Sequence, residues 1–481
     1  MIKFVNAPML FSAPQVIGLG LHEQDLLDRL VEVWKAKYPR NTLKKSYIDM
    51  KNTVENLGIS LPDYLADSLQ IVTSWPEKAV FELANLCRWE GVSSPDSPDD
   101  PFELSNLFRR NRFDVELPQA IASSMEQSVA FISTTHGDIP SGEPDVILMA
   151  HSAQWSTGLW DRRTRSLKAG LTIDETDDLG RPIRLTLFTP FEAIICATAG
   201  SRWFVDRVAV HGLRRTPLEP LPFKPTLDRP MGRSRINRAV MTISDRAVRA
   251  ALRMDVSSEI YTAPGLLLRG IDKEAFDDIA RSWDWKLGSV KGVTRDKEDE
   301  IPEVTTLPQQ TMQPYIEQIR ELAAEFSGAT NIPISQLGIV QDNPSSSEAM
   351  LTARMSLIED AENANLVYGY SLSRVYQNLV MLRDGLSEPS DELLRLDTKW
   401  GDAKRMSPTS KADAVVKQVS AIPELAETDV VLESLGYSGE QVRRIRAQIQ
   451  RSRGGSLLDR ALARQQAELD VEAGESELEE S

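Results

Sequence analysis

The sequence predicts an α+β protein that is mainly helical, and three observations support this fold class. Apolar residues recur at helical spacing across most of residues 22–133. Residues 145–215 alternate and are rich in Val, Ile, Thr, Phe and Trp, which indicates antiparallel strands. Long helical segments then follow at 234–260, 313–327 and 347–384. One β region therefore lies within an otherwise helical chain.

The composition excludes several classes of protein. Of the 481 residues, 41% are hydrophobic and 26% are charged, which is ordinary for a folded protein of about two to four domains. The net charge of −16 argues against tight wrapping of duplex DNA, because neutralising phosphates requires a basic surface. It is compatible with a channel through which DNA slides without sticking. The only cysteines, Cys87 and Cys196, fit a reducing compartment.

No segment predicts a membrane anchor or a secreted protein. A run of about 18 apolar residues, which a membrane-spanning helix requires, does not occur in the sequence. Residues 1–21 lack the basic and continuous apolar regions of a signal peptide. We therefore expect the protein to be made inside the cell and to have no membrane partner.

The first half of the chain predicts a run of helices followed by strands. The helices are expected around residues 26–34, 42–57, 77–89 and 117–133, with a proline-rich polar loop at 93–101. The strands are expected at 171–173, 183–188, 193–197 and 202–210, the first two joined by a turn at 174–182. Five prolines in residues 216–232 predict an extended connector without helix.

The second half predicts two helices that flank a small insert, then one long helix. Pro264-Gly265 ends the helix that begins at Ser234, and the insert that follows contains expected strands at 266–268 and 304–307 and a short helix at 273–283. Ser345 and Glu348 have the spacing of a capping box, in which each side chain satisfies a free backbone N–H at a helix start. Short helices are expected from about residue 411.

Motifs that carry catalysis are missing from the sequence, so we expect no catalytic residue, no metal and no cofactor. The four histidines, His22, His136, His151 and His211, are scattered and have no partner at a metal-ligand spacing. A glycine spacing at residues 265–270 resembles a phosphate loop, but Ile271 stands where the lysine is required.

One helix carries a stripe of arginines along one side. At about 100° per residue, the five arginines fall within an arc of about 80° over about 27 Å: Arg235, Arg238, Arg246, Arg249 and Arg253. A solvated helix face is the simplest explanation. The absence of lysine favours a packed contact instead, because the planar guanidinium pairs better with carboxylates. We interpret the stripe as an inter-helix or inter-subunit contact, with some arginines near DNA phosphates.

Three motifs in sequence order resemble portal proteins of siphophages, especially those of phages that infect actinobacteria. The segment 231–236 resembles their Gly-x-Ser-Arg-Ile stretch at the start of a long helix. Residues 322–326 and 332–338 are similar to their Leu-Ala element and the Ile-Pro-x-x-x-Leu-Gly element that follows it. Residues 343–350 resemble their Asn-Pro-x-Ser-x-Glu-Ala segment. The break before Ile332-Pro333 is longer here than in that pattern.

The resemblance implies a portal fold with wing, stem, clip and crown, assembled as a ring. The regions that it implies are: wing, 1–233, including the β region 145–215; first stem helix, 234–264; clip, 265–311; second stem helix, 312–338; tunnel loop, 339–346; long helix and return to the wing, 347–410; crown, 411–470; and a disordered acidic tail, 471–481. The implied DNA-facing tunnel residues are Asp342, Asn343, Pro344, Ser345 and Ser346.

The resemblance also implies a structural role and a set of partners. It implies a homo-oligomer of about twelve copies at the unique capsid vertex of a virion, assembled in the host cytoplasm. Double-stranded DNA would pass through its channel during packaging and ejection. The terminase large subunit, a head–tail adaptor and the major capsid protein would dock on it.

Two other hypotheses remain open from the residues. Another helical virion assembly or adaptor scaffold protein would show the same long helix and acidic tail. A metal-dependent nuclease is motivated only by the abundance of Asp and Glu, since no paired carboxylates stand at motif spacing.

Overall fold

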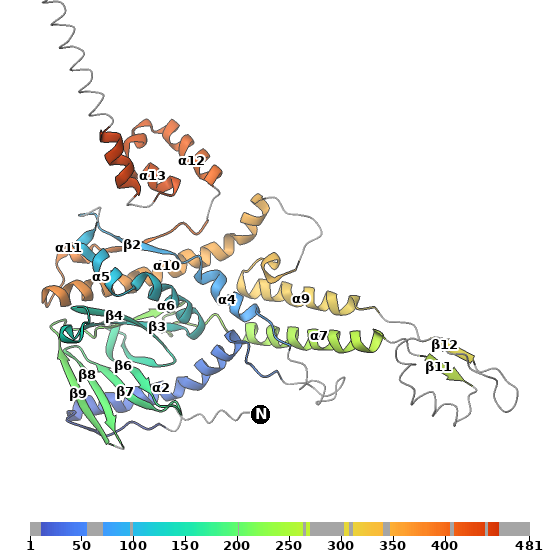
Figure 1. Cartoon of the computed structure of the whole chain (residues 1–481), viewed down its shortest axis with the longest axis horizontal. Coiled ribbons are helices and arrows are strands. Elements are labelled where there is room, and N and C mark those ends of the chain that lie inside the picture. The colour runs from blue at the N-terminus through green and yellow to red at the C-terminus, as the bar shows by residue number, and fades with distance from the viewer. Residues whose placement is uncertain are drawn as a thin grey trace, which may run out of the picture. The chain divides into compact units, whose positions relative to one another are not determined.

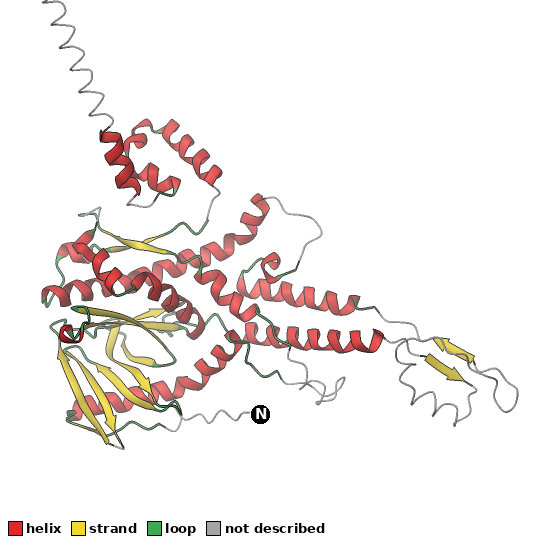
Figure 2. Cartoon of the chain, in the orientation of Figure 1, coloured by secondary structure: helices red, strands yellow, loops and turns green. Residues whose placement is uncertain are grey.

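The computed structural model describes residues 11–54, 71–96, 100–200, 202–262, 266–269, 303–306, 311–339, 347–404, 408–437 and 441–451. The chain divides into two units, Met1–Ala403 and Lys404–Ser481. Helices and strands both contribute, as Figure 2 shows, and the α+β class predicted from the sequence is confirmed.

A six-stranded sheet forms the largest β element of the first unit. Its strand order is β1-β9-β8-β7-β6-β5, and every neighbouring pair is antiparallel except β1 with β9. The strands are β1 (Val16–Ile17), β5 (Ser156–Asp161), β6 (Ser166–Thr176), β7 (Pro182–Phe188), β8 (Glu192–Ala199) and β9 (Arg202–Val210). The strands predicted between residues 171 and 210 are confirmed.

Helix α2 (Leu21–Ile48) lies against this sheet, as Figure 1 shows, and its buried apolar side chains pack on it. Leu27, Leu30 and Val31 pack against Leu171 and Leu187 of the sheet, and burial of such side chains stabilises by about 1.5–3 kcal/mol each. The prediction of separate helices at 26–34 and 42–57 is wrong. The helix continues through Pro39, because both of its ends are held by tertiary packing that the sequence pattern does not reveal.

A second, three-stranded sheet has the order β10-β3-β4 and consists of β3 (Val129–His136), β4 (Val146–Ser152) and β10 (Leu218–Pro222). Strand β10 comes from the proline-rich connector, and its prolines are tolerated because it lies at the sheet edge. The prediction of a helix over 117–133 is wrong at its end. Helix α6 (Phe113–Gln127) stops at Ser128, which has φ +89°, and the β-branched and aromatic residues that follow pair as β3.

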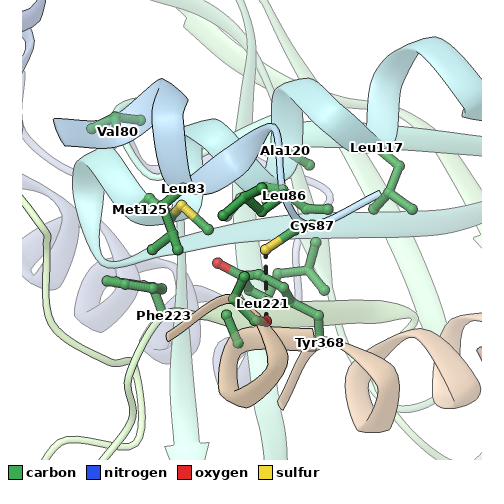
Figure 3. Packing of buried hydrophobic residues seen from close by; sticks show 14 of the residues in the cluster. Val80, Leu83, Leu86, Cys87, Leu117, Ala120, Met125, Leu221, Phe223 and Tyr368 are labelled. Carbon is green, nitrogen blue, oxygen red and sulfur yellow. Dashed lines mark hydrogen bonds between the residues drawn. The ribbon is translucent and has the colours of Figure 1, made fainter. Parts of the chain in front are cut away.

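The main apolar core lies between α4 (Trp75–Ala84), α6 and α10 (Ser347–Asp384). Figure 3 shows Leu83, Leu117 and Met125 packed around Cys87 and Tyr368. The Cys87 thiol donates to the carbonyl oxygen of Ala361 at 3.9 Å, and burial raises its pKa to about 12. This core holds the long helix α10 against α6 and α4.

Two further elements differ from the sequence predictions. The predicted helix over 77–89 ends at Ala84, and β2 (Trp89–Ser93) pairs with β13 (Asp397–Trp400), more than 300 residues away in sequence. Short helices α5 (Leu104–Arg110) and α11 (Asp391–Leu394) complete this region. Strand pairing across that separation leaves no local signal in either segment.

The helices and strands predicted between residues 234 and 384 are found close to their expected positions. They are α7 (Arg238–Thr262), β11 (Leu266–Arg269), β12 (Glu303–Thr306), α9 (Gln313–Thr330) and α10. β11 and β12 pair as antiparallel strands. The predicted helix 273–283 lies outside the described residues, as does the proposed capping serine, Ser345.

The second unit is helical in the part that the structure describes. It contains α12 (Pro408–Ala421), α13 (Asp429–Leu435) and a further helix at residues 441–451. The short helices predicted from residue 411 are confirmed there. The acidic tail 471–481 lies outside the described residues. Across the described residues of both units, no helix combines the length and the apolar character needed to cross a membrane.

Candidate functional site

Helices α7 and α9 form an antiparallel pair, visible side by side in Figure 1. Ser257 near the end of α7 donates to the Tyr315 hydroxyl at the start of α9, at 3.1 Å. Arg246 contacts Glu325, at 2.5 Å, further along both helices. Because the two helices run in opposite directions, the end of α7 and the start of α9 lie at the same end of the pair.

The arginines of α7 lie on the side that the rest of the chain leaves accessible. Arg238 and Arg246 are exposed, and Arg249 and Arg253 are half-buried. The rest of the helix surface carries buried apolar side chains: Val240, Ile243, Ala247, Ala250 and Leu252. This division into an apolar and a basic side agrees with the helical periodicity of the sequence.

Arg235 does not belong to this stripe, which corrects the prediction that placed it on the same helix face. Helix α7 begins three residues later, at Arg238, and the Arg235 side chain is only 6% exposed. Its Nε donates to the carbonyl oxygen of Ala79, and its Nη2 donates to that of Thr330. Burial lowers the pKa of Arg235, and the neighbouring Asp360 carboxylate opposes that shift. The guanidinium is therefore occupied inside the subunit.

The Asp360 carboxylate contacts three nitrogen donors near the start of α7 and the end of α9. Its Oδ1 lies 2.7 Å from Lys224 Nζ, and its Oδ2 lies 3.1 Å from Asn331 Nδ2 and 3.6 Å from Arg235 Nη1. We call these four residues the Asp360 cluster. It joins the connector, the start of α7, the end of α9 and the middle of α10. The carboxylate thereby supplies a counter-charge to the Arg235 guanidinium, which is only 6% exposed.

The first portal-like motif holds this junction together. Gly232 has φ +74°, and a Cβ there would overlap the carbonyl oxygens of Phe223 and Ser128. Ser234 Oγ donates to the carbonyl oxygen of Glu126. The side chain of Ile236 is buried in the main core. Each fixed position of the motif is therefore a packing or backbone requirement at the entrance to α7.

The second portal-like motif forms the exit from α9. The helix predicted over 313–327 is longer in the structure, because α9 continues to Thr330 and ends on Asn331 in the left-handed conformation, φ +58°. Ile332 and Leu337 are buried, and the carbonyl oxygen of Gln336 accepts from Lys78 Nζ at 2.6 Å. This segment turns the chain from α9 towards α10 and fixes it against α4.

A second buried cluster of charges ties β10 to α10. Glu219 is 4% exposed and pairs with Arg374 at 3.2 Å. Burial raises the pKa of Glu219, and Arg374 and Arg215 oppose that shift. Arg215 Nε donates to Asn378 Oδ1 at 2.7 Å. Sequence reasoning missed this cluster and the Asp360 cluster, since no spacing along the chain links their members.

The predicted tunnel residues Asp342, Asn343, Pro344, Ser345 and Ser346 lie outside the described residues. Among the residues that are described, no group of three or more His, Cys, Asp or Glu side chains is placed to hold a metal ion. The site is thus a helix pair with a basic side and an ionic junction around the buried Arg235.

Comparison with known proteins shows that the chain is similar to two phage portal proteins. The chain is 23% identical to the portal protein of Mycobacterium phage L5 over 406 residues, covering 83% of each chain. It is 24% identical to the portal protein of Mycobacterium phage D29 over 426 residues, covering 87% of each. The resemblance to siphophage portal proteins predicted from three short motifs is confirmed by these two relatives.

Two solved structures of GTA particle necks are also similar to the chain. A chain of "Neck of empty GTA particle computed with C6 symmetry" is similar at 13% identity, with a TM-score of 0.38, over 74% of this chain and 87% of that one. A chain of "Neck of native GTA particle computed with C12 symmetry" is similar at 12% identity, with a TM-score of 0.39, over 82% of this chain and 98% of that one. No protein-family model matches the chain.

Proposed function

We propose that the chain is the portal subunit of a tailed double-stranded DNA phage, one of about twelve copies in a closed ring at a single capsid vertex. The observation that carries the proposal is the similarity to two phage portal proteins over more than four-fifths of the chain. Two of the three portal-like motifs, 231–236 and 332–338, lie at the start of α7 and at the end of α9.

We propose the portal regions with the residue bounds that the resemblance implies. The wing consists of residues 1–233, and the chain returns to it at residues 385–410. Helices α7 and α9 serve as the stem, residues 265–311 as the clip and 339–346 as the tunnel loop. Residues 411–470 serve as the crown. The antiparallel α7/α9 pair supports this division, because an insert between antiparallel helices is carried at one end of the pair, where a motor or adaptor can reach it.

The proposed ring conducts DNA and catalyses nothing. A net charge of −16 suits a conduit, since weak contact allows a duplex to slide. The terminase large subunit, the head–tail adaptor and the major capsid protein are the proposed partners, in the virion and, before that, in the host cytoplasm.

The arginine stripe is proposed to contact the neighbouring subunit or DNA, now with Arg238, Arg246, Arg249 and Arg253 as its members. Their exposed or half-buried side chains remain accessible from outside the subunit. Carboxylates of an acidic neighbour are suitable partners for arginine. Arg246 is already paired with Glu325 of the same chain, so it would extend an existing pair into a small network.

Electron microscopy of the purified protein, with native mass spectrometry of the same sample, tests the proposed function. A closed ring of about twelve copies with an axial pore supports it. A monomer at high concentration in several salt conditions, or an open filament, contradicts it and favours a different helical virion scaffold or adaptor.

A paired charge reversal tests the stripe. We expect Arg246→Glu with Arg249→Glu to reduce the fraction of protein in rings while the thermal unfolding of the subunit changes little, because exposed pairs contribute only about 0–1 kcal/mol to folding. Arg162→Glu with Arg163→Glu, in the exposed turn between β5 and β6, makes the same charge change elsewhere. Normal ring yield in the α7 variant, measured by native mass spectrometry, would show that the stripe is not an assembly contact.

A further inference from the structure

A groove with strongly basic walls lies on the first unit, and one of its lining cations, Lys224, also pairs with Asp360. Its volume is about 1160 Å³, and it is bounded by α2, β5 and the segment that leads into α7. The basic side chains that line it are Lys37, Arg40, Lys44, Lys224, Arg229, Arg233 and Arg238. Asp228 is the acidic residue among the lining. The groove therefore has seven cationic side chains and one carboxylate, whereas the whole chain has a net charge of −16.

Most of these cations have no counter-charge within the part of the chain that the structure describes. Lys224 pairs with Asp360, and Lys44 Nζ reaches only the carbonyl oxygen of Gln127, at 3.4 Å. The ion pairs between described residues include none to the other five lining cations. Like charges gathered without partners raise the energy of the free groove, and a bound anion would lower it.

Lys44 shows the effect of this surrounding. Its pKa is lowered to about 8, mainly by burial; Glu126 opposes the shift, and Arg40 and Lys37 contribute to it. Residues 37, 40 and 44 recur at helical spacing, so α2 presents them along one side. The helix therefore brings three cations together along one wall of the groove.

Apolar side chains also line the groove, and we call them its floor. They favour an anionic ligand that also carries apolar groups. Leu43, Leu159, Trp160, Met231 and Met241 line the groove beside the cations. The side chain of Leu43 is 50% exposed, whereas Leu26, Leu27 and Leu30 of the same helix are buried. A nucleic-acid backbone offers phosphates but no apolar groups to cover such a floor. A peptide in which Asp and Glu alternate with Leu or Val offers both.

We propose that this groove is a docking site for an acidic, partly apolar peptide segment of a partner protein. The carboxylates of the segment pair with the arginines and lysines of the two walls, and its apolar side chains cover the floor. The site lies outside the α7/α9 contacts used for the proposed ring, except for Arg238, and the inference stands whether or not the ring forms.

Fluorescence anisotropy with a labelled synthetic peptide that alternates Glu and Asp with Leu and Val tests the proposal on the full chain. We expect saturable binding that weakens as salt is added, because exposed charge pairs are screened. The same peptide with Gln and Asn in place of the acids should not bind measurably. A peptide that keeps the acids but carries Ser in place of Leu and Val should bind several-fold more weakly, because the floor is then left uncovered.

Variants locate the binding. Lys37→Glu with Arg40→Glu should weaken the acidic peptide about tenfold or more, since reversal replaces attraction with repulsion on one wall. Arg162→Glu with Arg163→Glu carries the same charge change outside the groove and should leave the affinity within about twofold. Thermal unfolding curves of both variants establish that they fold.

Three results would overturn the proposal: no binding of the acidic peptide, equal weakening by both variants, or tighter binding of a short DNA duplex than of the peptide at the same ionic strength. The last result would make the groove a phosphate site. None of these outcomes depends on ring formation, so they are distinguishable from failure of the proposed function.

Discussion

Replacing Arg235 with Met removes the guanidinium at the centre of the junction while keeping a long apolar side chain. Two carbonyl oxygens, of Ala79 and Thr330, lose their donors in a region that water does not reach. Asp360 loses one of its three nitrogen donors. The variant therefore tests whether the residue belongs to the interior of the subunit or to its surface.

The expected loss of stability follows from these contacts. An unsatisfied buried acceptor costs about 1–3 kcal/mol, and removing one partner of a fully buried ion pair costs about 3–5 kcal/mol. The ionic part should be near 1 kcal/mol here, since Lys224 and Asn331 still hold Asp360 and the 3.6 Å separation is long. We expect Arg235→Met to lower the free energy of unfolding by about 4 kcal/mol.

Arg246→Met is the matched control, because it makes the same chemical change at an exposed position. Arg246 and Glu325 are 43% and 39% exposed, so their pair should contribute about 0–1 kcal/mol. Urea unfolding followed by tryptophan fluorescence and far-ultraviolet circular dichroism gives both free energies. Equal losses in the two variants, to within about 1 kcal/mol, would refute the assignment of Arg235 to a buried junction.

Two further variants test local features of the first unit. Gly232→Ala should lower the free energy of unfolding by about 3 kcal/mol or more, because a Cβ there meets two carbonyl oxygens. Gly200→Ala, also at positive φ but in open space, should lower it by only about 1 kcal/mol, and urea unfolding measures both. His211 is 7% exposed, and burial lowers its pKa from 6.5 to about 4, so its contribution to stability is complete above pH 6.5 and is lost as the pH falls towards 4. Between pH 7 and pH 5 this group should account for up to about 2 kcal/mol. The loss should be smaller by about this amount in His211→Gln than in the exposed control His22→Gln, because His151, whose pKa burial also lowers to about 4, contributes in both variants. Equal losses in the two variants would assign the effect to other groups.

Local patterns in the sequence were sufficient to place the long helices and most strands. The bounds of α9 and α10 and the strands of the large sheet follow from periodicity and from turn residues, which act over a few positions. The same is true of the division of α7 into an apolar and a basic side. These features depend on neighbours within one or two helical turns, which any single sequence displays.

Local patterns failed where tertiary packing chose between alternatives. The end of the helix predicted at 117–133 became strand β3, because pairing with β4 and β10 satisfies its backbone. The segment 89–93 became β2 through pairing with β13. The proline of α2 sits inside a helix because packing on both sides outweighs its local cost of about 3 kcal/mol.

The sequence by itself determined that this is a mainly helical α+β chain similar to phage portal proteins, and which segments form its helix pair. Only the tertiary structure decided that Arg235 faces inward while its neighbours on α7 face outward, and that Lys224 meets Asp360 across 136 positions. It also decided that basic residues from α2 and from the α7 entrance share one groove. The physical reason is that charge pairing and burial depend on distance in space, and the chain sets that distance only when its core has packed.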